Sequence, residues 1–198
     1  MTHGRIHRPG PGAERALERL HQEDFCQAQG IVPERKYQRE GGPSLKQCFR
    51  LLREASSAPV IDLARLLEAV IYNCLVGNND AHGKNFSLLY RGAGTANLEI
   101  RLAPLYDVAN TLYYTELSRD TAMKIGGEYS SEKVTVRNFE QLAEEAGLGK
   151  RLVRGRVAEM AERVIAGLAK VQIADPVAEK VAGLIRQRAE RVRDSFRN

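Results

Sequence analysis

The sequence predicts a single, mainly helical domain of the α+β class with a small β-hairpin at its centre. Three observations lead to this fold class. Residues 62–76 carry an apolar stripe at the helical period, two strand-like segments follow it, and the last third contains further helical patterns. A chain of 198 residues is long enough to bury one hydrophobic core.

The clearest helical pattern begins near Asp62. Its apolar residues recur at intervals of three and four and so form one continuous stripe, made of Leu63, Leu66, Leu67, Val70, Ile71, Cys74 and Leu75. Gly77 follows the stripe and is a typical residue to end a helix. We therefore expect this helix to be central and buried.

Shorter elements are expected on either side of this helix. A short helix is predicted from Gln22 to Gly30, and a second one after Ser44, a favourable N-cap residue. Downstream, Phe86–Tyr90 and Leu98–Leu102 are predicted as two strands joined by a glycine-rich turn.

The remainder of the chain is predicted to be a strand followed by helices. Ala122–Ile125 has the composition of a strand, and Asn138 is positioned to cap the helix after it. A further helix is expected over residues 153–168. Asp175 followed by Pro176 is typical of a cap and first residue, so the final helix should begin there.

Composition and charge are those of an ordinary globular protein, with 43% hydrophobic and 28% charged residues. No apolar run approaches the ~18 residues that a membrane span needs, so no membrane contact is expected. The three cysteines have no paired spacing, which favours reduced thiols and a cytoplasmic location. The net charge of +5 suits anionic partners, although the basic residues are spread along the chain as on solvated helix faces.

A polar loop between the striped helix and the first strand carries the candidate chemistry. Asp80 and Asn85 have the Asp-x4-Asn spacing of kinase catalytic loops, in which the Asp accepts the substrate hydroxyl proton and the Asn ligates Mg²⁺. Asp107 follows the hairpin, where a kinase places its metal-binding Asp. Mg²⁺ prefers carboxylate and amide oxygens, here those of Asn85 and Asp107, which leaves Asp80 to orient the attacking hydroxyl.

The Asp-x4-Asn pair alone is more typical of a turn whose side chains cap nearby backbone amides. His82 narrows the match to Asp-x-His-x-x-Asn, which resembles the catalytic loops of aminoglycoside and phosphoinositide kinases.

The wider pattern resembles the HipA family of toxin kinases over about residues 20 to 130. The segments that carry the resemblance are Leu20–Gln27, Lys36-Tyr37, Gly41–Pro43, Gly77–Ser87 and Leu102–Asp107.

The resemblance implies the C-terminal lobe of a protein-kinase-like enzyme that uses ATP and Mg²⁺. It implies that Asp80 is the catalytic base and that Asn85 and Asp107 bind the metal. The residues that it places against the nucleotide are His82, Lys84, Asn85, Tyr106 and Asp107. A bracing role in the loop is an equal alternative for His82, and Lys84 is alternatively an ordinary solvated lysine.

The N-terminal lobe of such a kinase is missing from the pattern. No phosphate-covering glycine loop and no strand lysine precede Asp80. Residues 5–8 resemble a remnant of the family's hinge. We therefore expect residues 1–14 to be an irregular lead-in and residues 15–198 to be a HipA-like C-terminal kinase domain.

The expected function is that of a serine/threonine protein kinase toxin from a toxin–antitoxin system. The resemblance implies a protein substrate, an aminoacyl-tRNA synthetase in studied members, and a DNA-binding antitoxin as partner. The alternative is a weakly active half-kinase that binds an antitoxin or a separate N-lobe subunit. A third alternative is a metal-dependent hydrolase using Asp80, His82 and Asp107, which would need a further metal ligand.

Overall fold

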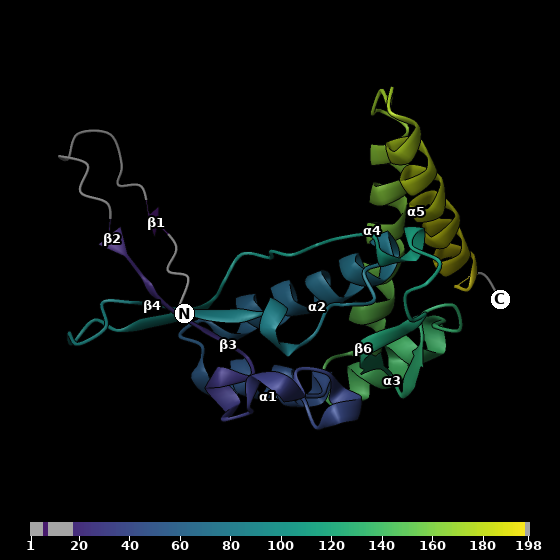
Figure 1. Ribbon diagram of the computed structural model, residues 1–198. Helices are drawn as coiled ribbons and strands as arrows, with labels where there is room; N and C mark the ends of the chain where they lie inside the picture. The colour runs from purple at the N-terminus through teal and green to yellow at the C-terminus, as the bar shows by residue number, and fades with distance from the viewer. Residues whose placement is uncertain (1–5, 8–17, 197–198) are drawn as a thin grey trace.

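The computed structural model describes residues 6–7 and 18–196. Figure 1 shows α2 crossing the middle of the molecule, with α4 and α5 at the opposite end from β1 and β2. In chain order the elements are β1 (Ile6–His7), β2 (Glu18–Arg19), β3 (His21–Asp24), η1 (Gln27–Gln29), η2 (Pro33–Arg35), η3 (Gln38–Glu40), α1 (Leu45–Ala55), α2 (Pro59–Val76), η4 (Gly83–Asn85), β4 (Ser87–Arg91), β5 (Glu99–Leu102), η5 (Thr111–Tyr113), β6 (Asp120–Ile125), β7 (Glu128–Ser130), α3 (Val136–Ala146), α4 (Lys150–Leu168) and α5 (Pro176–Asp194).

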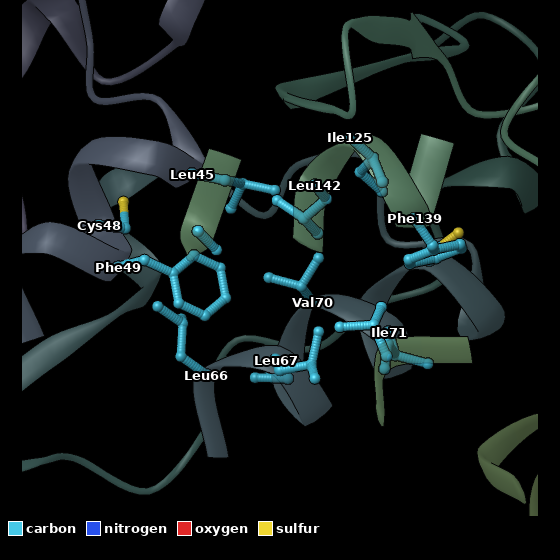
Figure 2. Packing of buried hydrophobic residues seen from close by; sticks show 14 of the residues in the cluster. Leu45, Cys48, Phe49, Leu66, Leu67, Val70, Ile71, Ile125, Phe139 and Leu142 are labelled. Atoms are coloured by element: carbon cyan, nitrogen blue, oxygen red, sulfur yellow. The ribbon is translucent and has the colours of Figure 1, made fainter. Parts of the chain in front are cut away.

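The hydrophobic core is built around α2, which confirms the prediction that this helix is central and buried. Leu67 is 1% exposed and Val70 is 5% exposed. Figure 2 shows Phe49 of α1, Val70 of α2 and Leu142 of α3 converging in this core. Helices α4 and α5 also pack on α2 and contribute Val157 and further apolar residues.

The ends of the first two helices follow from local chemistry. Ser44 caps α1 as predicted, and its backbone N–H donates to Oε1 of Gln47 at 2.8 Å in a reciprocal capping arrangement. Helix α2 begins at Pro59, three residues before the predicted start, because proline is well suited to the first helical position. It ends at Gly77, whose φ of +77° is readily adopted by glycine.

The predicted hairpin is confirmed and has a third strand. Strands β4 and β5 pair antiparallel, and β3 pairs antiparallel with the other edge of β4. The predicted helix from Gln22 is wrong, because residues 21–24 form the ladder of hydrogen bonds with β4 instead. The predicted end at Gly30 is retained as the left-handed residue that terminates the short helix η1.

The C-terminal part contains the predicted helices. Helix α3 begins at Val136, and its cap is Thr135 rather than Asn138. The Asn138 side chain instead accepts a hydrogen bond from the Thr135 N–H at 2.9 Å. Asp175 caps α5 as predicted and accepts from the N–H of Ala178 at 2.8 Å. The described elements, helices with small antiparallel sheets, confirm the predicted α+β class.

The N-terminal segment is described only in part. Within the predicted lead-in, Ile6–His7 forms strand β1 and pairs with Glu18–Arg19; the other residues of that lead-in, including the rest of the hinge-like segment, lie outside the described residues. In the described part of the chain, no helix combines the length and the apolar character needed to cross a bilayer.

Candidate active site

The loop that follows α2 is held at its start by the segment containing η5. The Thr111 hydroxyl donates to the Gly77 carbonyl at 3.1 Å and accepts from the Asn79 N–H at 2.9 Å. The Asn110 side chain donates to the Val76 carbonyl at 2.8 Å. These bonds use the backbone groups that the helix end leaves unpaired, so the loop leaves α2 in one defined direction.

Asn78 connects three parts of the site through one buried amide. Its Nδ2 group donates to Oδ1 of Asn73 in α2 at 2.8 Å and to the carbonyl of Asp107 at 3.2 Å. Its Oδ1 accepts from the N–H of Asp80 at 3.2 Å. A single side chain thereby fixes the helix end, the loop and the segment after β5 relative to one another.

The three residues predicted to carry phosphoryl transfer are linked in the structure through Asn85, which contacts the Asp107 carboxylate and the backbone carbonyl of Asp80. The Asn85 Nδ2 group donates to Oδ2 of Asp107 at 3.0 Å and lies 3.4 Å from the carbonyl of Asp80. Asn85 is buried, whereas Asp107 is exposed and has a φ of +55°. A positive φ is uncommon outside glycine and is best tolerated by Asn and Asp, so this turn aims the Asp107 carboxylate at a small cost in strain.

Asp80 lies on the wall of an open cleft of about 390 Å³, and 47% of its side chain is exposed. The Tyr37 hydroxyl donates to Oδ1 of Asp80 at 2.7 Å. Burial and this hydrogen bond raise the pKa of Tyr37 to about 12, so the hydroxyl remains a donor at neutral pH. One carboxylate oxygen is thus held by Tyr37 while the side chain stays accessible from the cleft.

His82 is buried directly behind Asp80. Its Nε2 lies 3.9 Å from Oδ2 of Asp80, and its ring meets the Tyr37 ring edge-on at 5.4 Å between centroids. Burial and the positive charge of Lys36 lower the pKa of His82, and the Asp80 carboxylate opposes that change. The described residues offer Nδ1 no hydrogen-bond partner. Both alternatives predicted for His82, a bracing role in the loop and a contact with a nucleotide, stay predictions.

The side chains of Lys84 and Tyr106 both contact other parts of the chain. The Lys84 ammonium forms an ion pair with Oδ2 of Asp24 at 3.2 Å. The Tyr106 hydroxyl donates to the Lys84 carbonyl at 2.7 Å and lies 2.6 Å from Oγ of Ser87. Burial raises the pKa of Tyr106. The prediction that these two side chains face a nucleotide stays a prediction.

Sequence reasoning missed two residues that shape the site. Tyr37 lies far upstream of Asp80, and no local pattern connects the two positions. Thr111 follows Asp107 closely, but a lone threonine gives no signal of its hydrogen bonds to a helix end. Asn78 was visible as part of the polar loop, although its role as a connecting residue was not.

The candidate metal ligands are one amide, Asn85, and one carboxylate, Asp107, rather than a cluster of acidic side chains. Within residues 6–7 and 18–196, no group of at least three His, Cys, Asp and Glu side chains gathers as for a metal ion. Asn85 with Asp107 suits Mg²⁺, which keeps several waters and takes few protein ligands. The same described residues offer no further metal ligand beside Asp80, His82 and Asp107, which the hydrolase alternative would need.

Comparisons with known proteins identify relatives of this chain. A putative kinase of Sinorhizobium fredii is 45% identical over 80% of this chain, and the serine/threonine-protein kinase toxin HipA of Shewanella oneidensis is 28% identical over 81%. The chain spans only 37% and 38% of the length of these curated relatives.

A solved structure has the same fold. It is the Shewanella oneidensis HipA, in complex with HipB and operator DNA, and it matches 98% of this chain and 54% of its own with a TM-score of 0.79 and 23% identity. Residues 5–168 match the family described as the HipA-like C-terminal domain. The chain therefore belongs to the HipA-like C-terminal domain family.

Proposed function

We propose that this chain supplies the catalytic loop and metal ligands of a Mg²⁺-ATP-dependent serine/threonine protein kinase that acts as the toxin of a toxin–antitoxin pair. The observation that carries the proposal is the hydrogen-bonded group formed by Asp80, Asn85 and Asp107. It joins the two candidate metal ligands directly and leaves the candidate base facing an open cleft.

In this proposal each residue has a distinct task. Mg²⁺ would offset phosphate charge and align the transferred group. Asn85 uses Nδ2 for its two hydrogen bonds, so Oδ1 is the atom that it would present to the cation beside the Asp107 carboxylate. Asp80 would accept the proton of a serine or threonine hydroxyl entering from the cleft, and Tyr37 would keep its carboxylate oriented.

Phosphate charge would have to be neutralised mostly from outside this chain. Lys84 is already paired with Asp24, and Asp80 and Asp107 add negative charge to that of ATP. We therefore infer that activity depends on an N-terminal lobe with a phosphate-binding lysine, either in the same protein or as a separate subunit. This chain alone would bind Mg²⁺-ATP weakly and would then serve chiefly as a binding module for an N-lobe or an antitoxin.

The test is calorimetric titration of Mg²⁺-ATP, followed by a labelled-phosphate assay with a HipA-type N-lobe supplied as a separate chain. Asp80→Asn should lower turnover at least about a hundredfold and leave nucleotide binding intact, because it removes only the base. Asp107→Asn should weaken Mg²⁺-ATP binding by at least about tenfold. Asp175→Asn is the matched control, since Asn caps helix α5 as well as Asp does.

Two results would contradict the proposal. Full turnover by the Asp80→Asn variant would remove Asp80 from the reaction. Equal nucleotide affinity in the Asp107→Asn variant and the wild type would remove the metal site. Tight nucleotide binding and brisk phosphorylation by this chain alone would instead refute the inferred dependence on an N-lobe.

A further inference from the structure

A second cleft, of about 870 Å³, lies between the η5 segment and α5. Figure 1 shows α5 standing at the end of the molecule away from β1 and β2. The basic and aromatic residues that line this α5 cleft are Tyr113, Tyr114, Arg119, Lys180, Arg188 and Arg191. Its volume is within the range of sites that hold a ligand or a short stretch of polypeptide.

The positive charges of the α5 cleft form no direct ion pair among the described residues, although Glu132 acts on Arg191 electrostatically. Among the described residues, none of the three arginines and the lysine that line it lies within 4.0 Å of a carboxylate oxygen. Arg119 and Arg191 donate instead to backbone carbonyls, at 2.9 Å and 3.2 Å. Outside the cleft, Arg154 of α4 and Arg193 of α5 do form ion pairs. The cleft therefore gathers four cations that form no ion pair within the described residues, beside two glutamates.

Arg188 is the most informative of these residues because it is only 4% exposed. Its guanidinium donates to the carbonyl of Cys74 in the last turn of α2, where the helix dipole is negative. The partial negative charge at the helix end compensates only part of the energetic cost of burying the full positive charge of Arg188. Burial and the charge of Arg188 lower the pKa of the neighbouring Arg191. An anion entering the α5 cleft would relieve the repulsion between these two guanidinium groups.

The other lining residues restrict what kind of anion fits. Tyr113 and Tyr114 form an edge-on ring pair with centroids 5.3 Å apart, and Tyr114 is 51% exposed. They offer an apolar surface with hydroxyl groups at its border. Glu116 and Glu132 also line the cleft and would repel a continuous chain of phosphates. Separate acidic groups with apolar groups between them match this pattern better than nucleic acid does.

We propose that the α5 cleft binds an acidic peptide segment of a protein partner, in which aspartate or glutamate alternates with aromatic or aliphatic residues. The carboxylates would pair with Arg191 and Lys180 at the mouth and with Arg188 deeper in the cleft. The apolar side chains would lie against the Tyr113–Tyr114 pair. This proposal does not rest on kinase activity, because none of these residues belongs to the candidate active site.

The experiment is a selection from a random octapeptide library against the full chain, followed by fluorescence anisotropy with the enriched peptide. Acidic peptides with aromatic or aliphatic residues should be enriched. The Lys180→Glu, Arg191→Glu double variant should bind the peptide at least about tenfold more weakly. Arg186→Glu reverses one charge on α5 outside the cleft, so it is the matched control for the single variant Lys180→Glu. Lys180→Glu alone, at an exposed position, is the second variant if the double variant fails to fold.

Three outcomes would overturn the proposal. The first is enrichment of peptides without acidic residues, or no enrichment at all. The second is an equal loss of binding in the Arg186→Glu control, which would indicate a nonspecific charge effect. The third is a single-stranded oligonucleotide of matched charge that competes with the peptide and binds more tightly, which would assign the cleft to nucleic acid. Replacing the peptide's acidic residues by Asn and Gln should abolish binding.

Discussion

The buried carboxylate of Asp62 should be one of the strongest single determinants of stability. It is fully buried in the first turn of α2 and accepts two hydrogen bonds from Arg101, at 3.1 Å and 3.2 Å. It also accepts from the Leu102 N–H at 2.9 Å and the Ser56 hydroxyl at 2.7 Å. These bonds attach β5, and through it the segment leading to Asp107, to the central helix.

The expected cost of Asp62→Asn follows from these contacts. The two hydrogen bonds from Arg101 are charge-assisted and contribute roughly 1.5–3 kcal/mol each. The Arg101 side chain is 29% exposed and regains part of its hydration when the ion pair is lost, while Asn still accepts from the Leu102 N–H. We therefore expect a loss of about 3 kcal/mol in the free energy of unfolding at pH 7.

The assay is urea unfolding followed by circular dichroism, with Glu99→Gln as the matched control. Glu99 contacts the same guanidinium at 3.3 Å, but its side chain is 40% exposed, so its loss should cost no more than about 1 kcal/mol. Burial acts to raise the pKa of Asp62, but the hydrogen bonds from Arg101, Leu102 and Ser56 bring the pKa below its usual value.

The lowered pKa of Asp62 determines how its contribution to stability changes with pH. The stabilisation from the Asp62 carboxylate should be complete above the pKa of the unfolded chain, at about pH 4, and should fall as the pH drops through the lower pKa of the folded state. The difference in free energy of unfolding between the wild type and Asp62→Asn should therefore decrease only below about pH 4. A cost below about 1 kcal/mol at pH 7, or a gap that narrows between pH 7 and pH 5, would refute the reasoning.

Four further predictions concern stability and reactivity. Leu67→Ala should lower the free energy of unfolding by about 2–5 kcal/mol in the same assay, and a smaller loss would contradict the central place of α2. Gly126→Ala should cost about 3 kcal/mol or more, because its Cβ would lie 1.8 Å from a backbone oxygen of α3. Gly155→Ala, in open space within α4, should stabilise by about 0.5–1 kcal/mol. Burial raises the pKa of Cys26 to about 11 and also raises the pKa of Cys48. These two thiols should therefore react with a thiol reagent at pH 8 only after the protein unfolds. Prompt reaction of the native protein would contradict this prediction.

The parts of the fold that could be predicted from sequence are those specified by local pattern. The stripe of α2, the Ser44 cap and the cap at Asp175 depend on residues a few positions apart, and the structure confirms them. The helix expected from Gln22 failed because the conformation of this segment is decided by its pairing with β4, which is distant in sequence. Local propensity carries no information about such a partner.

The candidate site likewise contains residues that local sequence pattern reveals and residues that only the folded structure brings in. Asp80 and Asn85 were found from their spacing within one loop, and Asp107 from its order after the hairpin. Tyr37 was not predicted as part of the site, because its contact with Asp80 is created by the packing of η3 and its neighbours around the loop. The positive φ of Asp107 could not be predicted either, since it occurs together with hydrogen bonds to Asn78 and Asn85, which lie more than twenty residues upstream.

The backbone conformation of Asp107 determines which substitutions at this position report on the carboxylate alone. At a φ of +55°, alanine would add a steric penalty of about 1 kcal/mol to the loss of the carboxylate, whereas asparagine tolerates this conformation and preserves the shape of the side chain. A phenotype from an alanine variant would therefore mix altered loop geometry with altered chemistry. A library screened only for folding at this position should return Gly, Asn and Asp together, and only a screen for activity would separate them.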